Sequence, residues 1–343
     1  MIAVNRMMCK NSLDFKRAWI RFREFGGLKL LWEYYRMGLV MPIIAAAFRC
    51  LKERRSLKTV YYVVQEKAEQ VLMERYGHLL KNGPDRQHLN DDFAGHVSQI
   101  IWTCWLQGLE QAPCLVKTCM ASQRDCFPDY EHRILTLDNY RQWVELPGWV
   151  VEKYAKGKIP AALFSDVLRV AVLKRYGGVW MDASVLCTGF GNLQLQKQWA
   201  EVESSQFAVF RYYSKGDRYP SGLSNWFIAA TPDNVVLTSV YDMLIAYWRD
   251  YDCTIDYYMM HLFISCALKA FPEMESGMPK LNSRFSLFLG DALSRTYRQE
   301  AWQELVDHVA IHKLNYRKAD EAQKNPHSYY NFIRKKIKND IQT

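Results

Sequence analysis

The stretch S-D-V-L-R at residues 165–169, followed by Y-G-G-V-W-M-D-A-S at residues 176–184, decides how the middle of this 343-residue chain folds. Apolar residues recur at helical spacing over residues 161–176 and predict one helix there. The two glycines end that helix, because glycine readily adopts the left-handed backbone that a helix terminus needs. The pattern then predicts a short strand over residues 179–182, and its last residue is an acid.

Strand and helix patterns alternate on both sides of this stretch. Residues 99–106 predict a buried strand, residues 112–124 a helix and residues 130–137 a second strand. A strand, a helix and a strand within about forty residues are typical of a parallel βαβ unit, so the pattern favours an α/β fold. The other predicted elements are a helix over 57–81, a strand over 225–230, helices over 235–249 and 257–271, and a strand over 308–312.

Two acids and an arginine are predicted to meet where the strand over residues 179–182 ends. Asp166 and Arg169 lie three residues apart, so they share one face of their helix. Asp182 ends the strand, and ligands of open α/β sheets collect beyond the carboxyl ends of strands. Arginine donates a fork of hydrogen bonds to phosphate, while carboxylates accept from sugar hydroxyls or hold a divalent cation. The spacing alone fits either such a pocket or an ordinary Asp–Arg helix pair beside a strand-end acid.

The block over residues 165–184 resembles the sugar-transferase signature of glycosyltransferase family 32 and, more closely, that of bacterial capsular polysaccharide synthesis proteins. The large clostridial glucosylating toxins show the same 16-residue step that separates Asp166 from Asp182 here. The resemblance extends over residues 97–315 and includes I-W-x-x-W-x-x-G at residues 101–108. It implies a GT-A-like fold with a mixed central sheet. It also implies a retaining glycosyltransferase that moves a hexose from a nucleotide sugar, a UDP-sugar, to a bacterial capsular or surface polysaccharide or a glycolipid.

The resemblance further implies roles for single residues. Trp105 would stack on the nucleotide base, although plain core packing also explains a tryptophan at this place. Asp166 and Arg169 would hold the hydroxyls of the donor sugar and the diphosphate side. Asp182, the first acid of the D-x-D motif, would bind the ribose and the metal shell, with Ser184 beside it. Asp166, Arg169 and Asp182 are therefore the expected catalytic residues.

A divalent cation, Mn²⁺ or Mg²⁺, is the cofactor that the resemblance implies. Ser184 stands where the second acid of D-x-D would be, and a hydroxyl is a weaker ligand for these ions than a carboxylate. Asp182 and His312 are the remaining candidate ligands, although a strand-end histidine is often only a hydrogen-bonded polar residue. We therefore expect the diphosphate to supply much of the cation's coordination.

Asp256 is a candidate for the acceptor side of the site. It begins a D-Y pair that resembles a stretch of the capsular proteins, and its carboxylate would serve the acceptor hydroxyl. The competing interpretation is structural, because an aspartate in this position also caps the helix predicted after it.

The net charge of +9 is concentrated near the N-terminus, where residues 1–60 hold 13 basic and four acidic side chains. Between residues 15 and 36, aromatic and apolar residues recur at helical spacing and alternate with Lys and Arg. Such a helix either lies on an anionic membrane or packs on its own domain with a solvated basic face. The apolar run over residues 37–48 is too short to span a membrane. We expect no nucleic-acid partner, because no recognisable binding module accompanies the charge.

Three segments are expected: a basic helical arm over residues 1–90, a GT-A-like domain over 91–320 and a basic tail over 321–343. The nine cysteines include no C-x-x-C pair, which indicates reduced thiols and a cytoplasmic protein, free or peripheral on the inner face of the cytoplasmic membrane. The sequence has no G-x-S-x-G, P-loop or H-E-x-x-H motif, which argues against the common hydrolases and NTPases. A degenerate binding or scaffold protein of a polysaccharide assembly complex stays open as the alternative.

Overall fold

The computed structural model describes residues 27–53, 57–82, 96–212, 222–256 and 258–342. Its main sheet has six strands: β1 (Ile100–Cys104), β2 (Glu131–Leu135), β3 (Gly178–Met181), β5 (Phe207–Arg211), β6 (Leu223–Ala230) and β7 (Leu281–Asn282). The strand order is β2-β1-β3-β6-β5-β7. Strand β1 runs parallel to β2 and β3, whereas β6 runs antiparallel to both β3 and β5. The predicted α/β fold with a mixed central sheet is confirmed, while the GT-A arrangement stays an expectation.

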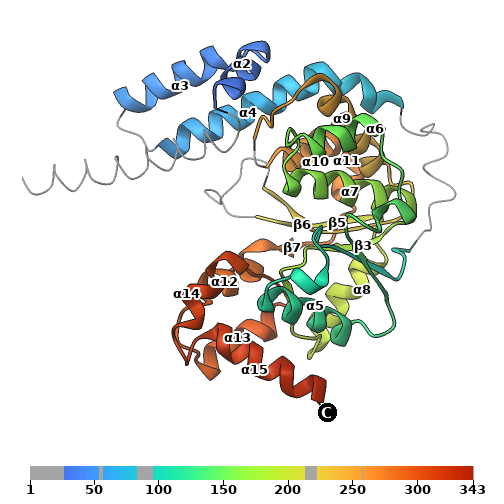
Figure 1. Ribbon diagram of the computed structural model, residues 1–343, viewed down its shortest axis with the longest axis vertical. Coiled ribbons are helices and arrows are strands. Elements are labelled where there is room, and N and C mark those ends of the chain that lie inside the picture. The colour runs from blue at the N-terminus through green and yellow to red at the C-terminus, as the bar shows by residue number, and fades with distance from the viewer. Residues whose placement is uncertain (1–26, 54–56, 83–95, 213–221, 257, 343) are drawn as a thin grey trace, which may run out of the picture.

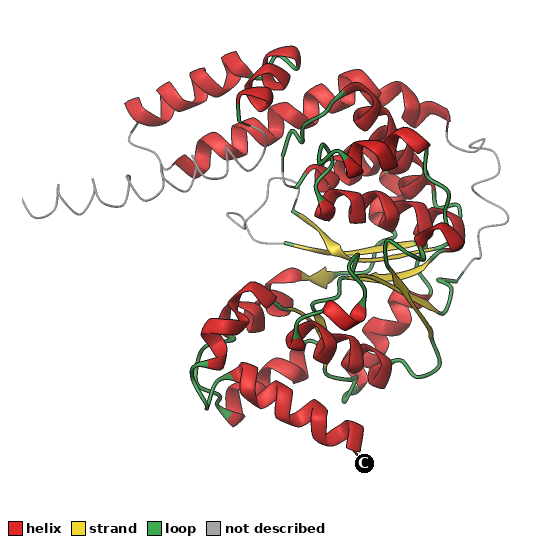
Figure 2. Ribbon diagram, in the orientation of Figure 1, coloured by secondary structure: helices red, strands yellow, loops and turns green. Residues whose placement is uncertain are grey.

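Helices cover both faces of this sheet (Figures 1 and 2). On one side lie α6 (Gly148–Ala155), α7 (Ala161–Tyr176), α9 (Val235–Asp250), α10 (Met259–Ala270) and α11 (Pro272–Ser276). On the other side lie α5 (Cys114–Cys126), α8 (Leu193–Glu203), α12 (Ser283–Ala292), α13 (Gln299–His308), α14 (Ala319–Gln323) and α15 (Tyr329–Gln342). Short 3-10 helices occur at η1 (Gly77–Asn82), η3 (Leu109–Gln111), η4 (Tyr140–Gln142) and η5 (Tyr316–Lys318).

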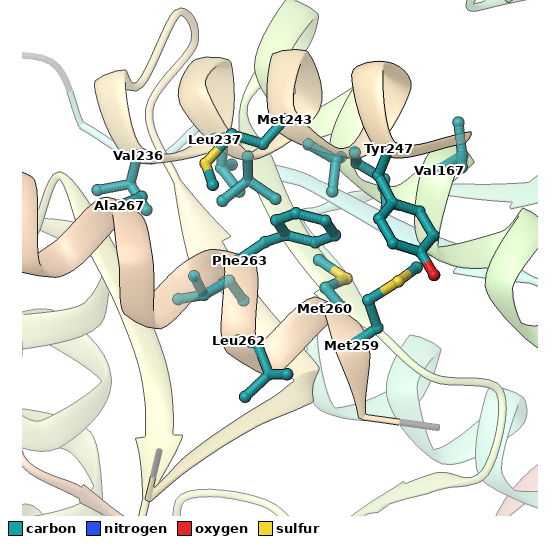
Figure 3. Packing of buried hydrophobic residues seen from close by; sticks show 14 of the residues in the cluster. Val167, Val236, Leu237, Met243, Tyr247, Met259, Met260, Leu262, Phe263 and Ala267 are labelled. Carbon is teal, nitrogen blue, oxygen red and sulfur yellow. The ribbon is translucent and has the colours of Figure 1, made fainter. Parts of the chain in front are cut away.

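The largest hydrophobic core joins α7, α9 and α10 (Figure 3). Val167 of α7, Met243 and Tyr247 of α9, and Met260 and Phe263 of α10 are fully or almost fully buried in it. Burying an apolar side chain of this size contributes about 1.5–3 kcal/mol. The cluster therefore fixes the three helices against one another and holds α7, which carries polar residues of the site, against the sheet.

Helix α7 ends at Tyr176 with Gly177 as its C-cap, and β3 begins at Gly178. Both glycines have positive φ angles, +62° and +97°. A Cβ atom at residue 178 would lie 2.6 Å from the carbonyl oxygen of Ile100 on β1. Only glycine therefore allows both the turn and the close pairing of β3 with β1. The predicted helix and the strand after it are present within one residue of their expected bounds.

Of the N-terminal helices α2 (Leu28–Arg36), α3 (Val40–Lys52) and α4 (Leu57–Tyr76), α4 packs against α9 and α10, whereas α3 packs against α4 and projects beyond the domain (Figure 1). The Tyr34 hydroxyl donates to the carbonyl of Ile255 at 2.8 Å, and the Tyr76 hydroxyl donates to Asp250 at 3.0 Å. Ala68 and Leu72 of α4 belong to the same core cluster as the apolar residues of α10. The described part of the expected arm thus shares a core with the domain. Residues 15–26 of the expected membrane helix and the expected boundary at residue 90 lie outside the described residues.

A second, two-stranded antiparallel sheet pairs β4 (Val185–Cys187) with β8 (Ile311–Lys313). The strand predicted over residues 308–312 is thus found later in the chain, because α13 continues to His308. Helix α15 of the basic tail packs its tyrosines against α5 and α13. No helix in the described ranges has the length and apolar character to cross a bilayer.

Candidate functional site

The site centres on Arg169, whose guanidinium joins two carboxylates. Its Nη1 lies 2.8 Å from Oδ1 of Asp166, and its Nη2 lies 2.8 Å from Oδ1 of Asp182. The same guanidinium lies over the ring of Trp180, whose Nε1 donates to Oδ1 of Asp182 at 2.9 Å. Asp166 and Arg169 are buried, whereas the Asp182 side chain keeps 24 % of its surface exposed. The three residues predicted to meet form one cluster, and Asp182 is its acid most open to a ligand.

Neighbouring elements fix the position of Asp182. It follows the last residue of β3, and its backbone N–H donates to the carbonyl of Trp226 on β6 at 2.9 Å. The Gln123 side chain of α5 donates to the carbonyl of Val185, at the start of β4, at 2.8 Å. The turn from β3 to β4 is therefore held from both sides, and the carboxylate of Asp182 is presented in a defined direction.

Lys313 is a further member of the cluster, and the sequence analysis missed it. Its ammonium, from β8, lies 2.6 Å from Oδ2 of Asp182 and 2.9 Å from Oγ of Ser184. It pairs with Val185 in the β4–β8 ladder. Its strand, β8, has only three residues, too few for a period of two to be recognised, so the sequence pattern gave no signal for it.

His312 lies next to Lys313 in the chain but is not in this cluster. The histidine is fully buried, and its Nε2 lies 3.1 Å from Oγ1 of Thr188. Burial lowers the pKa of His312 to about 3, so the ring is neutral. The structure therefore does not bring this sequence-predicted metal ligand to Asp182.

Burial and the neighbouring charges shift the pKa values of the two carboxyl groups in opposite directions. Burial tends to raise the pKa of Asp182, but the charges of Lys313 and Arg169 outweigh it and hold this pKa below its usual value. Burial raises the pKa of Asp166 to about 6, against the opposing effect of Arg169. Burial also lowers the pKa of nearby His261 to about 3. With both acids ionised, two negative and two positive side chains face one another.

Trp105 lies beside the loop that carries Asp182. Its half-buried ring meets the ring of Tyr316 edge to face, with the centroids 5.5 Å apart. Both rings pack against a small cluster that includes Ala183, the residue between Asp182 and Ser184. The structure therefore brings Trp105 to the site and adds Tyr316, which lies three residues beyond Lys313 in the sequence but was not predicted.

Asp256 lies in the turn before α10. Its Oδ1 accepts hydrogen bonds from the backbone N–H of Tyr258 at 2.6 Å and from the side chain of Gln65 on α4 at 3.2 Å. The contacts are structural, but Asp256 does not cap the helix as expected, because the N-cap of α10 is Tyr258 and no side chain among the described residues caps it. Asp256 instead closes the turn by accepting from the N–H two residues ahead, as aspartate commonly does. Two residues after Tyr258, the sulfur of Met260 lies 3.6 Å from Nη1 of Arg169, so the turn borders the cluster without joining it.

The described residues do not fit the divalent cation that the sequence predicts. Oδ1 of Asp182 accepts from Arg169 and Trp180, while Oδ2 accepts from Lys313. The Lys313 ammonium lies between Oδ2 and the Ser184 hydroxyl, where an ion shared by these two side chains would bind. In the part of the chain that the structure describes, no three His, Cys, Asp or Glu side chains gather as a metal-binding group. A cation between Asp182 and Ser184 would first have to displace the lysine.

Comparisons with known proteins bear on this cluster. A family model described as capsular polysaccharide synthesis protein matches residues 49–333. The chain belongs to this family. The match includes every member of the cluster and confirms the family resemblance drawn from residues 165–184.

A solved structure described as PaToxG glycosyltransferase is 16 % identical to this family member. The likeness covers 63 % of this chain and 80 % of that one, with a TM-score of 0.39. No curated protein matches the chain.

Proposed function

We propose that this capsular polysaccharide synthesis protein is a retaining glycosyltransferase. It moves a hexose from a nucleotide sugar, a UDP-hexose, to a growing capsular or other bacterial surface polysaccharide or to a glycolipid. The observation that carries the proposal is the Asp166–Arg169–Asp182 cluster at the carboxyl end of β3, with Lys313 against its exposed acid. The family match and the motif over residues 165–184 support it.

In the proposed reaction, the bond between C1 of the hexose and the diphosphate oxygen breaks, and a bond from C1 to the acceptor oxygen forms on the same face of the ring. The acceptor's proton passes to the departing diphosphate, so no protein nucleophile is required. Asp182 accepts hydrogen bonds from donor hydroxyls, with Asp166 behind it. Arg169 positions both acids through its two contacts. Such preorganised charge is usually the largest single contribution to a rate enhancement.

The Trp105–Tyr316 pair is the proposed platform for the nucleotide base. Aromatic rings offer a flat apolar surface on which a base stacks, and this contact contributes about 1–3 kcal/mol per base in nucleic-acid complexes. The rings pack beside Ala183 in the same loop as Asp182, so a base on them would leave its diphosphate near the cluster. The acceptor would approach from the side of the turn before α10, where Asp256 lies.

We also propose that an anionic membrane surface is a partner of this protein. Of the eleven large hydrophobic side chains exposed in the described part of the chain, seven belong to α2 and α3: Leu28, Leu31, Trp32, Tyr35, Met41, Ile44 and Phe48. Basic residues are in excess over the same region of the sequence. Exposed apolar side chains next to positive charge are typical of helices that lie in an anionic lipid interface.

The test of the enzymatic proposal combines a ligand screen with one variant. UDP-, GDP-, ADP- and CDP-hexoses are screened for an increase in melting temperature, because a ligand that binds the folded state stabilises it. Release of the nucleoside diphosphate from the stabilising donor is then measured with the wild type and with Asp182→Asn. We expect the variant to fold and its turnover to fall at least about a hundredfold, since a charge aimed at the reacting centre is lost.

Asp291→Asn is the matched control, because Asp291 lies on the surface and pairs with Lys318 at 3.1 Å. Near-normal turnover of Asp182→Asn contradicts the assignment of the site. A nucleotide sugar that stabilises the protein but is neither hydrolysed nor transferred would favour the alternative role as a degenerate binding or scaffold protein.

A further inference from the structure

The ammonium of Lys313 lies between the two side chains of the D-x-S motif, 2.6 Å from Oδ2 of Asp182 and 2.9 Å from Oγ of Ser184. We infer that Lys313 supplies, from the protein itself, the positive charge that a departing diphosphate requires, in the place where the D-x-D pattern implies a divalent cation. The inference rests on the proposed transfer from a nucleotide sugar and deepens it.

The chemistry of lysine suits this role. An ammonium is a compact charge with three N–H donors, and lysine is a common phosphate ligand. Among the described residues, Asp182 and Ser184 accept from Lys313, which leaves a third N–H for a phosphate oxygen. The Lys313 side chain keeps 23 % of its surface exposed, so a ligand can reach it.

The charge of Lys313 explains why residue 184 is a neutral serine and not a second acid. A second carboxylate at residue 184 would add a negative charge to a cluster in which Asp166 and Asp182 already balance Arg169 and Lys313. The neutral hydroxyl of Ser184 instead accepts a hydrogen bond from Lys313 without adding charge. The departure of this sequence from D-x-D is therefore the change expected when an ammonium replaces a metal ion.

The backbone holds Lys313 in a fixed position. Its strand pairs with β4 at Val185, and the backbone N–H of Leu314 donates to the carbonyl of Ser184 at 2.9 Å. On the opposite side, α12 approaches so closely that a Cβ atom at Gly290 would lie 2.5 Å from the Lys313 carbonyl oxygen. The charge is thus preorganised, as electrostatic stabilisation of a leaving group requires.

The experiment is calorimetric titration of UDP, GDP, ADP and CDP into the full-length protein, once with EDTA and once with MnCl₂. We expect the nucleotide that binds to do so with the same affinity in both conditions. Lys313→Met, which keeps the apolar stem but removes the charge, should weaken binding in EDTA at least about tenfold, since a charge-assisted hydrogen bond to the phosphate is lost. Lys318→Met is the control, because Lys318 lies on the surface and pairs with Asp291.

A second variant separates this role from a merely structural one. Lys313→Ala combined with Ser184→Asp removes the ammonium and restores the second carboxylate, so its binding of the nucleotide should become dependent on Mn²⁺. Wild-type binding that requires Mn²⁺, or Lys313→Met binding as tightly as the wild type in EDTA, overturns the inference and leaves the transferase proposal standing. Failure of all four nucleotides to bind in either condition overturns the proposed function and this inference with it.

Discussion

Asp166 and Asp182 contact the same guanidinium, yet of these two acids Asp166 alone has a pKa close to the physiological range. Asp182 has a second cation, Lys313, against its other oxygen, and this contact keeps it ionised. Asp166 is more deeply buried and depends on Arg169 for its compensating charge, so burial dominates and raises its pKa to about 6. His261, which lies near Arg169 and Asp182, stays neutral because burial lowers its pKa to about 3.

The raised pKa of Asp166 predicts a pH-dependent contribution to stability. The folded protein binds this proton more tightly than the unfolded chain does. The stabilisation is therefore complete below a pH of about 3.8 and is lost as the pH rises through about 6. Relative to Asp166→Asn, the wild type should gain up to about 3 kcal/mol in free energy of unfolding between pH 7 and pH 4. Urea denaturation of both proteins at each pH measures this difference, and a difference that does not change with pH contradicts the prediction.

The residues of the cluster differ in how far a sequence pattern could find them. Asp166 and Arg169 share a face of one regular helix, and a two-glycine turn places Asp182 a short strand later, so local rules suffice to bring the three together. Lys313 meets Asp182 across 131 positions of the chain, and no local pattern encodes that contact. Tyr316 was not predicted for the same reason. Its partner Trp105 lies near the start of the domain's sequence, whereas Tyr316 lies near its end.

At the scale of elements, short strands were the hardest to predict. The bounds of α7 follow from its apolar period and its terminal glycines, and the structure confirms them. Strands β4 and β8 have three residues each, and β7 has two, which is too few for a period of two to be recognised. The predicted bounds of β8 were wrong, and this affected the predicted site. Because the strand was expected to end at His312, that residue was predicted as a ligand, and Lys313 was not.

The contact between α12 and β8 gives a prediction at this scale. Gly290→Ala would place a Cβ atom 2.5 Å from the Lys313 carbonyl oxygen, so the helix and the strand must move apart. We expect a loss of about 1–3 kcal/mol in stability, the usual cost of overpacking. Since β8 also carries the lysine, the affinity for the nucleoside diphosphate should fall as well, and calorimetry measures it.

Gly277→Ala is the control for this substitution. Its Cβ would lie 3.5 Å from the nearest atom, the Glu273 carbonyl oxygen, which is an ordinary contact, and its φ of −82° suits alanine. Gly290→Ala that binds the nucleotide as tightly as Gly277→Ala would show that the exact place of β8 does not matter to the ligand.

For the whole molecule, the exposed apolar side chains of α2 and α3 predict the surface through which the protein binds lipid. The side chains of Trp32 and Phe48 are 60 % and 70 % exposed, so Trp32→Asp together with Phe48→Asp should leave the fold intact. The wild type should co-sediment with vesicles that contain phosphatidylglycerol, and rising salt should release it because surface attraction is screened. The double variant should lose this binding and keep its turnover on a soluble acceptor.

Leu193→Asp is the matched control, because Leu193 is also exposed, at 64 %, but belongs to α8 on the other side of the sheet. It should bind vesicles like the wild type. Equal sedimentation with neutral vesicles, or unchanged binding of the double variant, would contradict an anionic lipid partner. Either result would instead favour the interpretation in which α2 and α3 only pack on the domain.

The long sequence separation between Lys313 and Asp182 also sets the order in which the residues of the cluster are synthesised. The two acids and Arg169 are synthesised first, and the lysine follows 131 positions after Asp182. At a synthesis rate of about 5–20 residues per second, the interval is of the order of ten seconds. During it the nascent chain carries the acids without the ammonium proposed to receive the diphosphate. Under the proposed function, an incomplete translation product would therefore not consume nucleotide sugar.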